Sequence, residues 1–401
     1  MEHPINLCSH EFNQNTHQYF AWMRQEAPVY KARMSRRKSA YIITRYDDVV
    51  SLIMDERIAK DPNNAKGNGG GNGMIWMPKA MDPLIHNMLN SDEPDHRRLR
   101  NLVHKAFTPR MIVALAPRIE AIANELVDEM LQKEDVELIR DFALPLPVRV
   151  ITEMLGIPVE EREEFRSFAA RFLVTPTPLN MVKAIPAVLG FFKYTRKLAE
   201  KRRVDPQDDL LTALVQAEED GDRFTEEELL GMVFLLLVAG HETTVNLIAN
   251  GTLALLQNPD QLALLQGDLG LMDTAIEEFV RYDGPLITTE GSFAKEPITL
   301  HGVTMPQGAL ILPAILSANR DETVFENADQ LDVTRNPNKH VAFGKGIHYC
   351  LGAPLARLEG KIAFSTLLTR CPNLRLAVGR EQLRYRDLLI IHRLDAVPVA
   401  V

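Results

Sequence analysis

One long helical pattern limits what this chain of 401 residues can fold into. Thr225 and Glu228 have the spacing of a capping box, and the mostly apolar segment that follows them continues to Gln257. A helix over these 33 residues would be about 50 Å long, because each residue adds about 1.5 Å. A rod of that length crosses a whole domain, so we expect it to be the central helix of the fold.

Shorter helical patterns dominate the rest of the chain, and strands are few. Val29–Met34 and Ser39–Thr44 predict a hairpin, followed by a short helix over Asp47–Asp55. Further strands are predicted at Ile298–His301, Ala309–Pro313 and Leu388–Leu394. Helices are predicted at His96–Phe107, Ile112–Lys133, Pro145–Leu155, Val159–Val174, Pro186–Arg203 and Leu210–Glu218, with breaks at Pro176, Pro178 and Pro186. The predicted fold class is mainly α with a minor β-sheet region (α+β).

Composition and charge exclude several classes of protein. Hydrophobic residues make up 46% of the chain and no linker divides it, so we expect a single domain over residues 1–401. A net charge of -9 argues against a nucleic-acid binder. The longest apolar run, Leu229–Gly240, has 12 residues, fewer than the ~20 that span a bilayer. Because three cysteines also suit a reducing compartment and the N-terminus lacks an apolar signal core, we expect a cytoplasmic protein without a membrane anchor.

A glycine-rich segment, Asn63–Gly73, is the only low-complexity stretch of the sequence. Its five glycines predict a mobile loop. A linker between domains is the alternative, but the segments on either side do not look like separate domains. We therefore expect a mobile lid over a binding pocket.

A polar cluster interrupts the apolar run of the long helix at Ala239–Thr244. Glycine inside a helix costs about 1 kcal/mol relative to alanine, and a buried carboxylate costs several kcal/mol unless it is partnered. Such a local violation often marks a functional site. The alternative is that Thr243 and Thr244 bond to preceding carbonyls and bend the helix, while Glu242 reaches solvent.

A second unusual stretch, Phe343–Gly352, is called the cysteine loop below. Gly344 and Gly346 permit positive φ, so successive N–H groups can converge on an anion. That anion would be the thiolate of Cys350, which lies just before a strongly helical segment whose N–H groups also favour a thiolate. A buried structural cysteine in an ordinary turn is the alternative.

Two further groups of charged residues stand at helical spacing. Glu278 and Arg281 share a helix face, although Glu277 is an equally good partner for Arg281 by spacing alone. From His96 to Arg110 the cations occur without an acid, and a solvated basic face is the simplest interpretation.

The order Phe-Gly-x-Gly-x-His-x-Cys-x-Gly in the cysteine loop resembles the haem-ligand signature of the cytochrome P-450 superfamily. The resemblance extends over most of the chain, through Tyr41–Asp47, Ala106–Pro109, Ala318–Asp321 and Leu351–Arg357. It implies a cytochrome P-450 fold with a long central helix and a haem b whose axial ligand is the thiolate of Cys350. The chain looks most like soluble bacterial members that tailor polyketides and other secondary metabolites.

The resemblance also implies roles for individual residues. Glu242 and Thr243 would be the acid-alcohol pair that relays protons, and Glu278, Arg281 and Arg335 would form a buried structural network. The residues expected to bind the cofactor, with His96, Arg100 and His348 at its propionates, are His96, Arg100, Ala239, Phe343, Gly344, Gly346, His348 and Gly352. Where the family usually has another arginine at a propionate, this chain has Ser292, so that carboxylate would rely on the other donors or on water. Lys295 is the alternative source of the missing cation.

The implied function is a haem-thiolate monooxygenase that inserts one oxygen atom from O2 into a hydrophobic small molecule by hydroxylation or epoxidation. The expected pocket residues are mostly apolar: Phe234, Leu237, Val238, Leu286, Ile287, Thr288, Leu389 and Ile390. A ferredoxin or flavodoxin type electron donor is expected at a basic proximal face that includes Arg97, Lys105, Lys345 and Arg357. A peroxide-dependent peroxygenase and a non-catalytic haem-based sensor or carrier are the alternatives.

Overall fold

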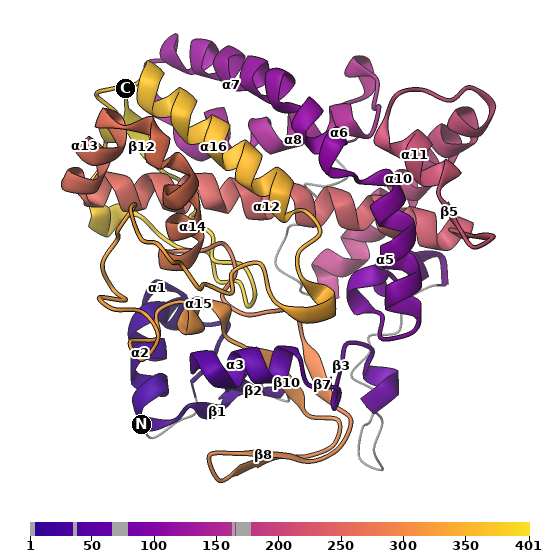
Figure 1. Ribbon diagram of the computed structural model, residues 1–401, viewed down its shortest axis with the longest axis horizontal. Helices are drawn as coiled ribbons and strands as arrows, with labels where there is room; N and C mark the ends of the chain where they lie inside the picture. The colour runs from indigo at the N-terminus through magenta and orange to yellow at the C-terminus, as the bar shows by residue number, and fades with distance from the viewer. Residues whose placement is uncertain (1–4, 35–37, 66–78, 163–164, 166–177) are drawn as a thin grey trace. The chain divides into compact units, whose positions relative to one another are not determined.

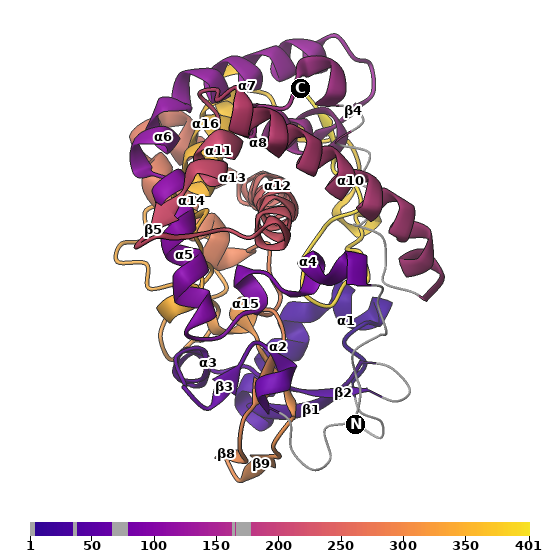
Figure 2. The same cartoon turned by 90° about the vertical axis from the view of Figure 1, so that its right-hand side faces the viewer.

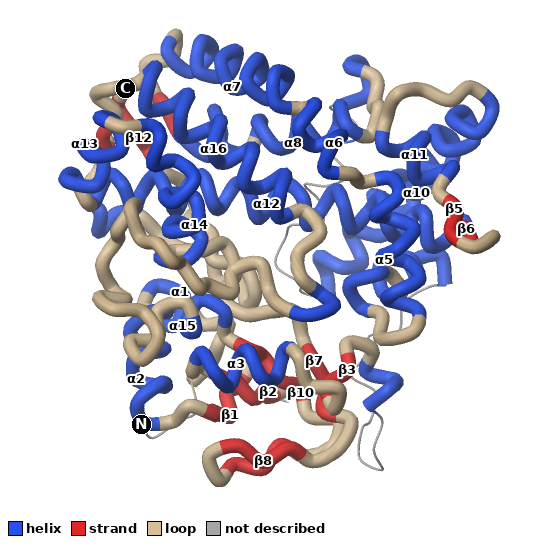
Figure 3. Tube along the Cα trace, in the orientation of Figure 1, coloured by secondary structure: helices blue, strands red, loops and turns tan. Residues whose placement is uncertain are grey.

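The computed structural model describes residues 5–34, 38–65, 79–162, 165 and 178–401. The predicted fold class is confirmed, because helices make up most of the described chain and the strands are few and short (Figure 3). The chain groups into two compact units. Unit 1 comprises Met1–Gly71, Ala123–Pro145 and Thr243–Val401, and unit 2 comprises Asn72–Ile122 and Leu146–Glu242.

The predicted long helix is α12 (Glu226–Gln257), which is seen end on in Figure 2. Its capping box is formed: the N–H of Glu228 donates to Thr225 Oγ1 at 3.2 Å, and the N–H of Thr225 donates to Glu228 Oε2 at 2.9 Å. Among the described residues α12 is also the one helix long and apolar enough to cross a membrane. Its most apolar window is 61% buried inside the protein, as in the core helix of a globular protein.

Unit 1 contains a five-stranded sheet in the order β1-β2-β10-β7-β3. Its strands are β1 (Val29–Arg33), β2 (Ser39–Ile43), β10 (Leu310–Pro313), β7 (Ser292–Ala294) and β3 (Ile58–Ala59). The predicted hairpin is therefore confirmed, with Val29 opposite Ile43. The predicted short helix is α3 (Tyr46–Ile53), which lies beside the sheet in Figure 1 and buries Val49 and Leu52 in the same core cluster as Ile43.

A second core of unit 1 joins α14 (Met272–Tyr282), α16 (Ala353–Arg370) and the C-terminal half of α12. The rings of Phe279 and Phe364 lie 4.6 Å apart at its centre. A Cβ at Gly251 would lie 2.6 Å from Phe364 Cζ, so only glycine allows α12 this close to the aromatic pair. Unit 1 also contains short 3₁₀ turns and the following elements: α1 (His10–Gln14), α2 (Thr16–Glu26), α13 (Pro259–Gly267), α15 (Ile315–Ala318), a π-helical turn (Ile139–Ala143), the sheet β11-β12-β4 (Arg375–Leu376, Pro398–Ala400, Val136–Glu137) and the hairpin β8-β9 (Ile298–Leu300, Val303–Met305).

Unit 2 is mostly helical, and apolar side chains pack against the N-terminal half of α12. Phe234 of α12 packs against Phe191 and Phe192 of α10 (Pro178–Val204), with ring centroids 5.8 and 6.5 Å apart. Its elements are α4 (Asp82–Ile85), α5 (Asp95–Ala106), α6 (Pro109–Ala114), most of α8 (Pro145–Met154), α10 (Pro178–Val204), α11 (Leu210–Gln216) and the hairpin β5-β6 (Glu218–Glu219, Asp222–Arg223). The helix α7 (Ala116–Leu131) begins in unit 2 and continues into unit 1.

Three sequence-based expectations differ from the structure. Pro186 lies inside α10 instead of beginning a helix after a break. The helix predicted over Ile112–Lys133 is two helices, α6 and α7, separated at Leu115. Leu388–Leu394 is not a strand, because this segment makes only isolated bridges, Leu286 with Ile391 and Tyr385 with Leu394. Most of the predicted lid and most of the helix predicted over Val159–Val174 lie outside the described residues.

Candidate active site

The cysteine loop forms a tight series of turns in unit 1. Gly344 and Gly346 have φ values of 72° and 68°, which a side chain would strain. The N–H of Cys350 donates to the carbonyl oxygen of Phe343 at 2.9 Å and closes the loop on itself. The two glycines thus take the conformation that the sequence pattern requires, and they bring Cys350 to the end of the loop.

Cys350 stands two residues before Gly352, the N-cap of α16, and is half-buried. The N-cap residue Gly352 has no side chain to cap α16, so the positive end of this 18-residue helix can favour a thiolate. A Cβ at Gly352 would lie 3.9 Å from Cys350 Sγ, in space that the glycine leaves open. These features fit a thiolate that ligates the iron of a flat group such as haem.

Arg357 of α16 contacts the first residue of the cysteine loop, Phe343. Its guanidinium lies over the ring of Phe343, 4.4 Å from the centroid, and its Nε and Nη2 atoms donate to Glu277 at 2.6 and 2.8 Å. His340 Nε2 lies 2.9 Å from the same carboxylate. Burial alone would raise the pKa of Glu277, but hydrogen bonds from Arg357 and His340 lower it to about 2.

The structure brings Glu278, Arg281 and Arg335 together in unit 1. Both side chains of the Glu278–Arg281 pair are 0% exposed, with Arg281 Nε 2.7 Å from Glu278 Oε2. Arg335 Nε donates to the same oxygen at 3.1 Å. By spacing alone, Glu277 and Glu278 were equal candidates for the partner of Arg281. In the structure Glu278 pairs with Arg281, and Glu277 pairs with Arg357.

The polar cluster of α12 is divided between the two units. In unit 2, His241 and Glu242 are each 2% exposed, so Glu242 does not reach solvent, and His241 Nε2 lies 3.9 Å from Glu242 Oε2. Nearby on the same helix, Leu237 is buried, Phe234 and Val238 are half-buried, and Ala239 is exposed.

In unit 1, Thr243 is half-buried and Thr244 is 1% exposed. Thr244 hydrogen-bonds a carboxyl that the sequence analysis missed, Glu359 of α16. Burial raises the pKa of Glu359 to about 8, although the bond from Thr244 opposes this shift. The sequence gives no local signal for this contact, because a single glutamate in a helical segment is common and Thr244 is far from it in the chain.

Two of the cofactor residues expected in unit 2, His96 and Arg100, lie on α5. His96 is 1% exposed and Arg100 is half-buried, one helical turn further along. Burial and then the charge of Arg100 lower the pKa of His96. His348 belongs to unit 1, where it is half-buried in the cysteine loop.

Two of the expected pocket segments meet in unit 1. Leu286 bridges to Ile391, and the N–H of Ile287 donates to the carbonyl oxygen of Ile390 at 2.7 Å. Leu389 is half-buried and packs against an apolar cluster. Thr288 is 1% exposed, and its hydroxyl has no hydrogen-bond partner among the described residues. A buried hydroxyl without a partner is costly, so its position is suited to a polar group of a bound molecule.

Ser292 has a cationic neighbour that the sequence analysis did not consider. Lys60 Nζ donates to Ser292 Oγ at 3.0 Å and to the carbonyl oxygen of Glu290 at 3.2 Å. Lys295, which the sequence analysis named as the alternative cation, instead donates to the carbonyl oxygen of Glu56 at 2.8 Å. The cation beside Ser292 is therefore Lys60.

Three of the four cations expected at a basic docking face are paired with acids. Arg97 Nε lies 3.0 Å from Glu93 Oε2, Lys105 Nζ lies 2.7 Å from Glu219 Oε2, and Arg357 binds Glu277. The ammonium of Lys345 lies 5.8 Å from the centroid of the Tyr46 ring. The local charge near these residues is thus more balanced than the sequence indicated.

The helical fold and the cysteine loop at the start of α16 define a haem-thiolate type of protein, and comparisons with known proteins agree. The family model for Cytochrome P450 matches residues 2–164 and 161–375. The chain belongs to the cytochrome P450 family, and it is accordingly an oxidoreductase of the monooxygenase class with a haem-thiolate cofactor.

Several relatives match almost the whole chain. Cytochrome P450 107B1 of Saccharopolyspora erythraea is 44% identical over 397 residues, 97% of this chain and 95% of the relative. The polyketide biosynthesis cytochrome P450 PksS of Bacillus subtilis is 41% identical, and its solved structure aligns with a TM-score of 0.92 over 100% of this chain and 99% of its own. Cytochrome P450 monooxygenase PikC of Streptomyces venezuelae is 40% identical over 98% of this chain and 93% of the relative.

Proposed function

We propose that this protein hydroxylates or epoxidises a hydrophobic small molecule in secondary metabolism, with haem b held by the thiolate of Cys350. The observation that carries the proposal is the position of Cys350, which follows two glycines of positive φ and precedes the N-terminus of α16, where the N-cap residue is Gly352. When bound, the haem supplies the one-electron and oxygen chemistry that amino-acid side chains lack.

The substrate class follows from the expected pocket segments. Leu286–Thr288 and Leu389–Ile391 present mainly aliphatic side chains, with the hydroxyl of Thr288 as a polar exception. A pocket of this kind takes an apolar molecule and orients it through few polar contacts. PksS is named for polyketide biosynthesis, which supports a substrate of that general size and polarity.

Proton delivery is assigned to the polar cluster of α12. His241 Nδ1 and the carbonyl oxygen of Leu237 lie 2.6 Å apart, and since a carbonyl only accepts, Nδ1 must carry a proton. In the neutral ring Nε2 is then an acceptor, and at 3.9 Å it is too far from Glu242 Oε2 for a direct hydrogen bond. We propose that Glu242 and Thr243 pass protons toward the reacting oxygen.

The other proposed roles come from the family resemblance. His96, Arg100 and His348 would bind the propionates, while Ala239, Phe343, Gly344, Gly346 and Gly352 would lie against the macrocycle. Residues 1–401 would act as one catalytic domain in the cytoplasm and receive electrons from a ferredoxin or flavodoxin type donor. The relatives support this proposal because they match nearly the whole length of the chain.

Replacement of the proposed ligand tests the assignment. Because a thiolate gives the reduced carbonyl complex its red-shifted Soret band, Cys350→His should bind haem without that band and should lose turnover. Cys8→Ser, which changes an exposed cysteine, should keep both properties. Parent protein supplied with isotopically labelled dioxygen and apolar candidate substrates should give a product that contains one labelled oxygen atom. A parent-like spectrum from Cys350→His would contradict the proposal.

A further inference from the structure

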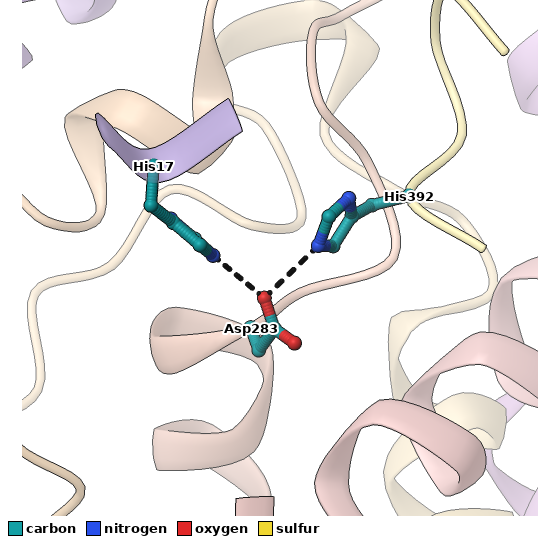
Figure 4. Close-up of side chains that lie close together, drawn as sticks. All are labelled: His17, Asp283 and His392. Carbon is teal, nitrogen blue, oxygen red and sulfur yellow. Dashed lines mark hydrogen bonds and ion pairs between the residues drawn. The ribbon is translucent and has the colours of Figure 1, made fainter. Parts of the chain in front are cut away.

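We propose that His17, Asp283 and His392 form a binding site for a divalent metal ion of the zinc type. Figure 4 shows both imidazoles directed at one carboxylate oxygen, and one ligand atom from each residue lies within 4.8 Å of the others. All three residues belong to unit 1, and none of them is among the residues assigned to the haem.

The distances suit a metal ion after small side-chain movements. His17 Nε2 and His392 Nε2 lie 2.8 and 3.1 Å from Asp283 Oδ1. Around tetrahedral zinc, with bonds of about 2.0–2.2 Å, neighbouring ligand atoms stand roughly 3.3 Å apart. Two imidazoles and a carboxylate are also a typical zinc donor set, and they leave a fourth position for water. His17, whose side chain is 30% exposed, provides access from solvent.

His392 supplies an independent observation that points to a ligand. Its side chain is 2% exposed, yet neither ring nitrogen makes an aligned hydrogen bond with any described residue. Its Nε2 instead faces Asp283 Oδ1, an oxygen that already accepts a hydrogen bond from His17. A metal ion between these atoms would give the buried imidazole a partner.

Neighbouring side chains hold the three ligands in place. Tyr385 donates its hydroxyl to Asp283 Oδ2 at 3.0 Å, and its ring stacks on His392 with centroids 4.0 Å apart. Asn250 Nδ2 donates to the backbone carbonyl oxygens of Asp283 and His392 at 3.1 and 3.0 Å. Contacts of this kind orient the ligands of established metal sites.

One nearby cation opposes metal binding. Arg320 is close enough for its charge to act on His17. Arg320 Nη1 lies 3.1 Å from Asp329 Oδ1, and that carboxylate offsets part of the charge.

A metal ion here would have a structural effect. The ligands come from α2, from the residue that ends α14 and from the C-terminal segment, and His17 and Asp283 are 266 positions apart. Joining distant parts of a chain stabilises the folded state by restricting the unfolded one. We therefore expect zinc to raise the melting temperature. The competing explanation is a hydrogen-bonded cluster that binds no metal.

The experiment uses untagged, haem-loaded protein that is dialysed against a chelator, incubated with a small excess of Zn²⁺ and separated from unbound metal. Elemental analysis should find about one zinc per chain, in addition to iron, in the parent and in the control His10→Gln. His10 is a suitable control because it also pairs with an aspartate, Asp387, at 3.2 Å. His17→Gln and His392→Gln should retain at least tenfold less zinc, and zinc should raise only the melting temperatures of the parent and the control.

A second measurement does not depend on how well the variants fold. Zinc K-edge X-ray absorption of the unmodified protein should show two imidazole nitrogens and carboxylate oxygen at about 2.0–2.2 Å, without sulfur. The proposal is overturned if the parent retains no zinc, if sulfur occurs in the zinc shell, or if both histidine variants retain as much zinc as the parent.

Discussion

At the scale of single residues, Lys60 lies beside Ser292, the position at which this chain is expected to lack the family's usual arginine. The hydroxyl of Ser292 accepts a hydrogen bond from Lys60 Nζ. The two residues are 232 positions apart, but β3 and β7 pair and bring them together. We infer that Lys60 supplies the positive charge that the serine cannot.

The first prediction is that Lys60→Met speeds the loss of haem to apomyoglobin by roughly tenfold. A hydrogen bond to a charged group contributes about 1.5 to 3 kcal/mol, and a tenfold change corresponds to about 1.4 kcal/mol. Lys295→Met is the matched control, since its ammonium binds a backbone carbonyl of Glu56 and its loss should leave the rate unchanged. Adding Ser292→Arg to Lys60→Met should restore slow release. Equal rates for the two lysine variants would exclude a role for Lys60.

At the scale of elements, one buried carboxylate connects α14 to the loop that leads toward Cys350. Glu278 accepts hydrogen bonds from Arg281, Arg335, Asn338 and the N–H of Asp332. Arg281 donates in addition to the backbone carbonyl oxygens of Asn319, Ala328 and Gln330. The loop therefore depends on a charge pair that water does not reach.

The second prediction is that Glu278→Gln lowers the free energy of unfolding by about 3 to 5 kcal/mol, because it leaves Arg281 buried without a compensating charge. Glu277→Gln is the control at the neighbouring position, where the carboxylate is 27% exposed, and its loss should be clearly smaller. Urea unfolding of both variants at neutral pH measures the difference. Similar losses of unfolding free energy in the two variants would show that burial of the Glu278–Arg281 pair does not determine how much the pair stabilises the protein.

At the scale of the whole molecule, the buried carboxyl of Glu359 links stability to pH. Its side chain is 2% exposed, and its Oε2 has no hydrogen-bond partner among the described residues. Burial raises its pKa from 4.5 to about 8. Between these two values the folded protein keeps a proton that the unfolded chain releases. The contribution of Glu359 to stability is therefore complete below pH 4.5 and is lost as the pH rises through about 8.

The third prediction is that Glu359→Gln removes this dependence, since an amide does not titrate. The free energy of unfolding of the parent, relative to that of the variant, should fall by a few kcal/mol between pH 5 and pH 8.5, at up to about 1.4 kcal/mol per pH unit. Glu381→Gln, which changes an exposed carboxyl, should follow the parent. Parallel curves for the parent and Glu359→Gln would mean that Glu359 titrates normally in the folded state.

Much of the local structure could be predicted from the sequence because its interactions close within a few residues. The capping box of Thr225 and Glu228 starts α12 where expected, and the 3.6-residue pattern ends it at Gln257. The two glycines of the cysteine loop have the positive φ that their spacing indicated. The order of residues around Cys350 was sufficient to indicate the family, because a thiolate ligand places strict local demands on the backbone.

Only the tertiary structure decided which distant groups meet. Glu277 and Glu278 have equivalent spacing to Arg281, and the burial of Glu278 against Arg335 and the position of Arg357 beside Glu277 separate their roles. The segment around His392 has the composition of a strand, but among the described residues it makes only isolated bridges. Pairing, burial and the pKa values that follow from them depend on partners tens to hundreds of residues away, and local sequence patterns carry no information about such partners.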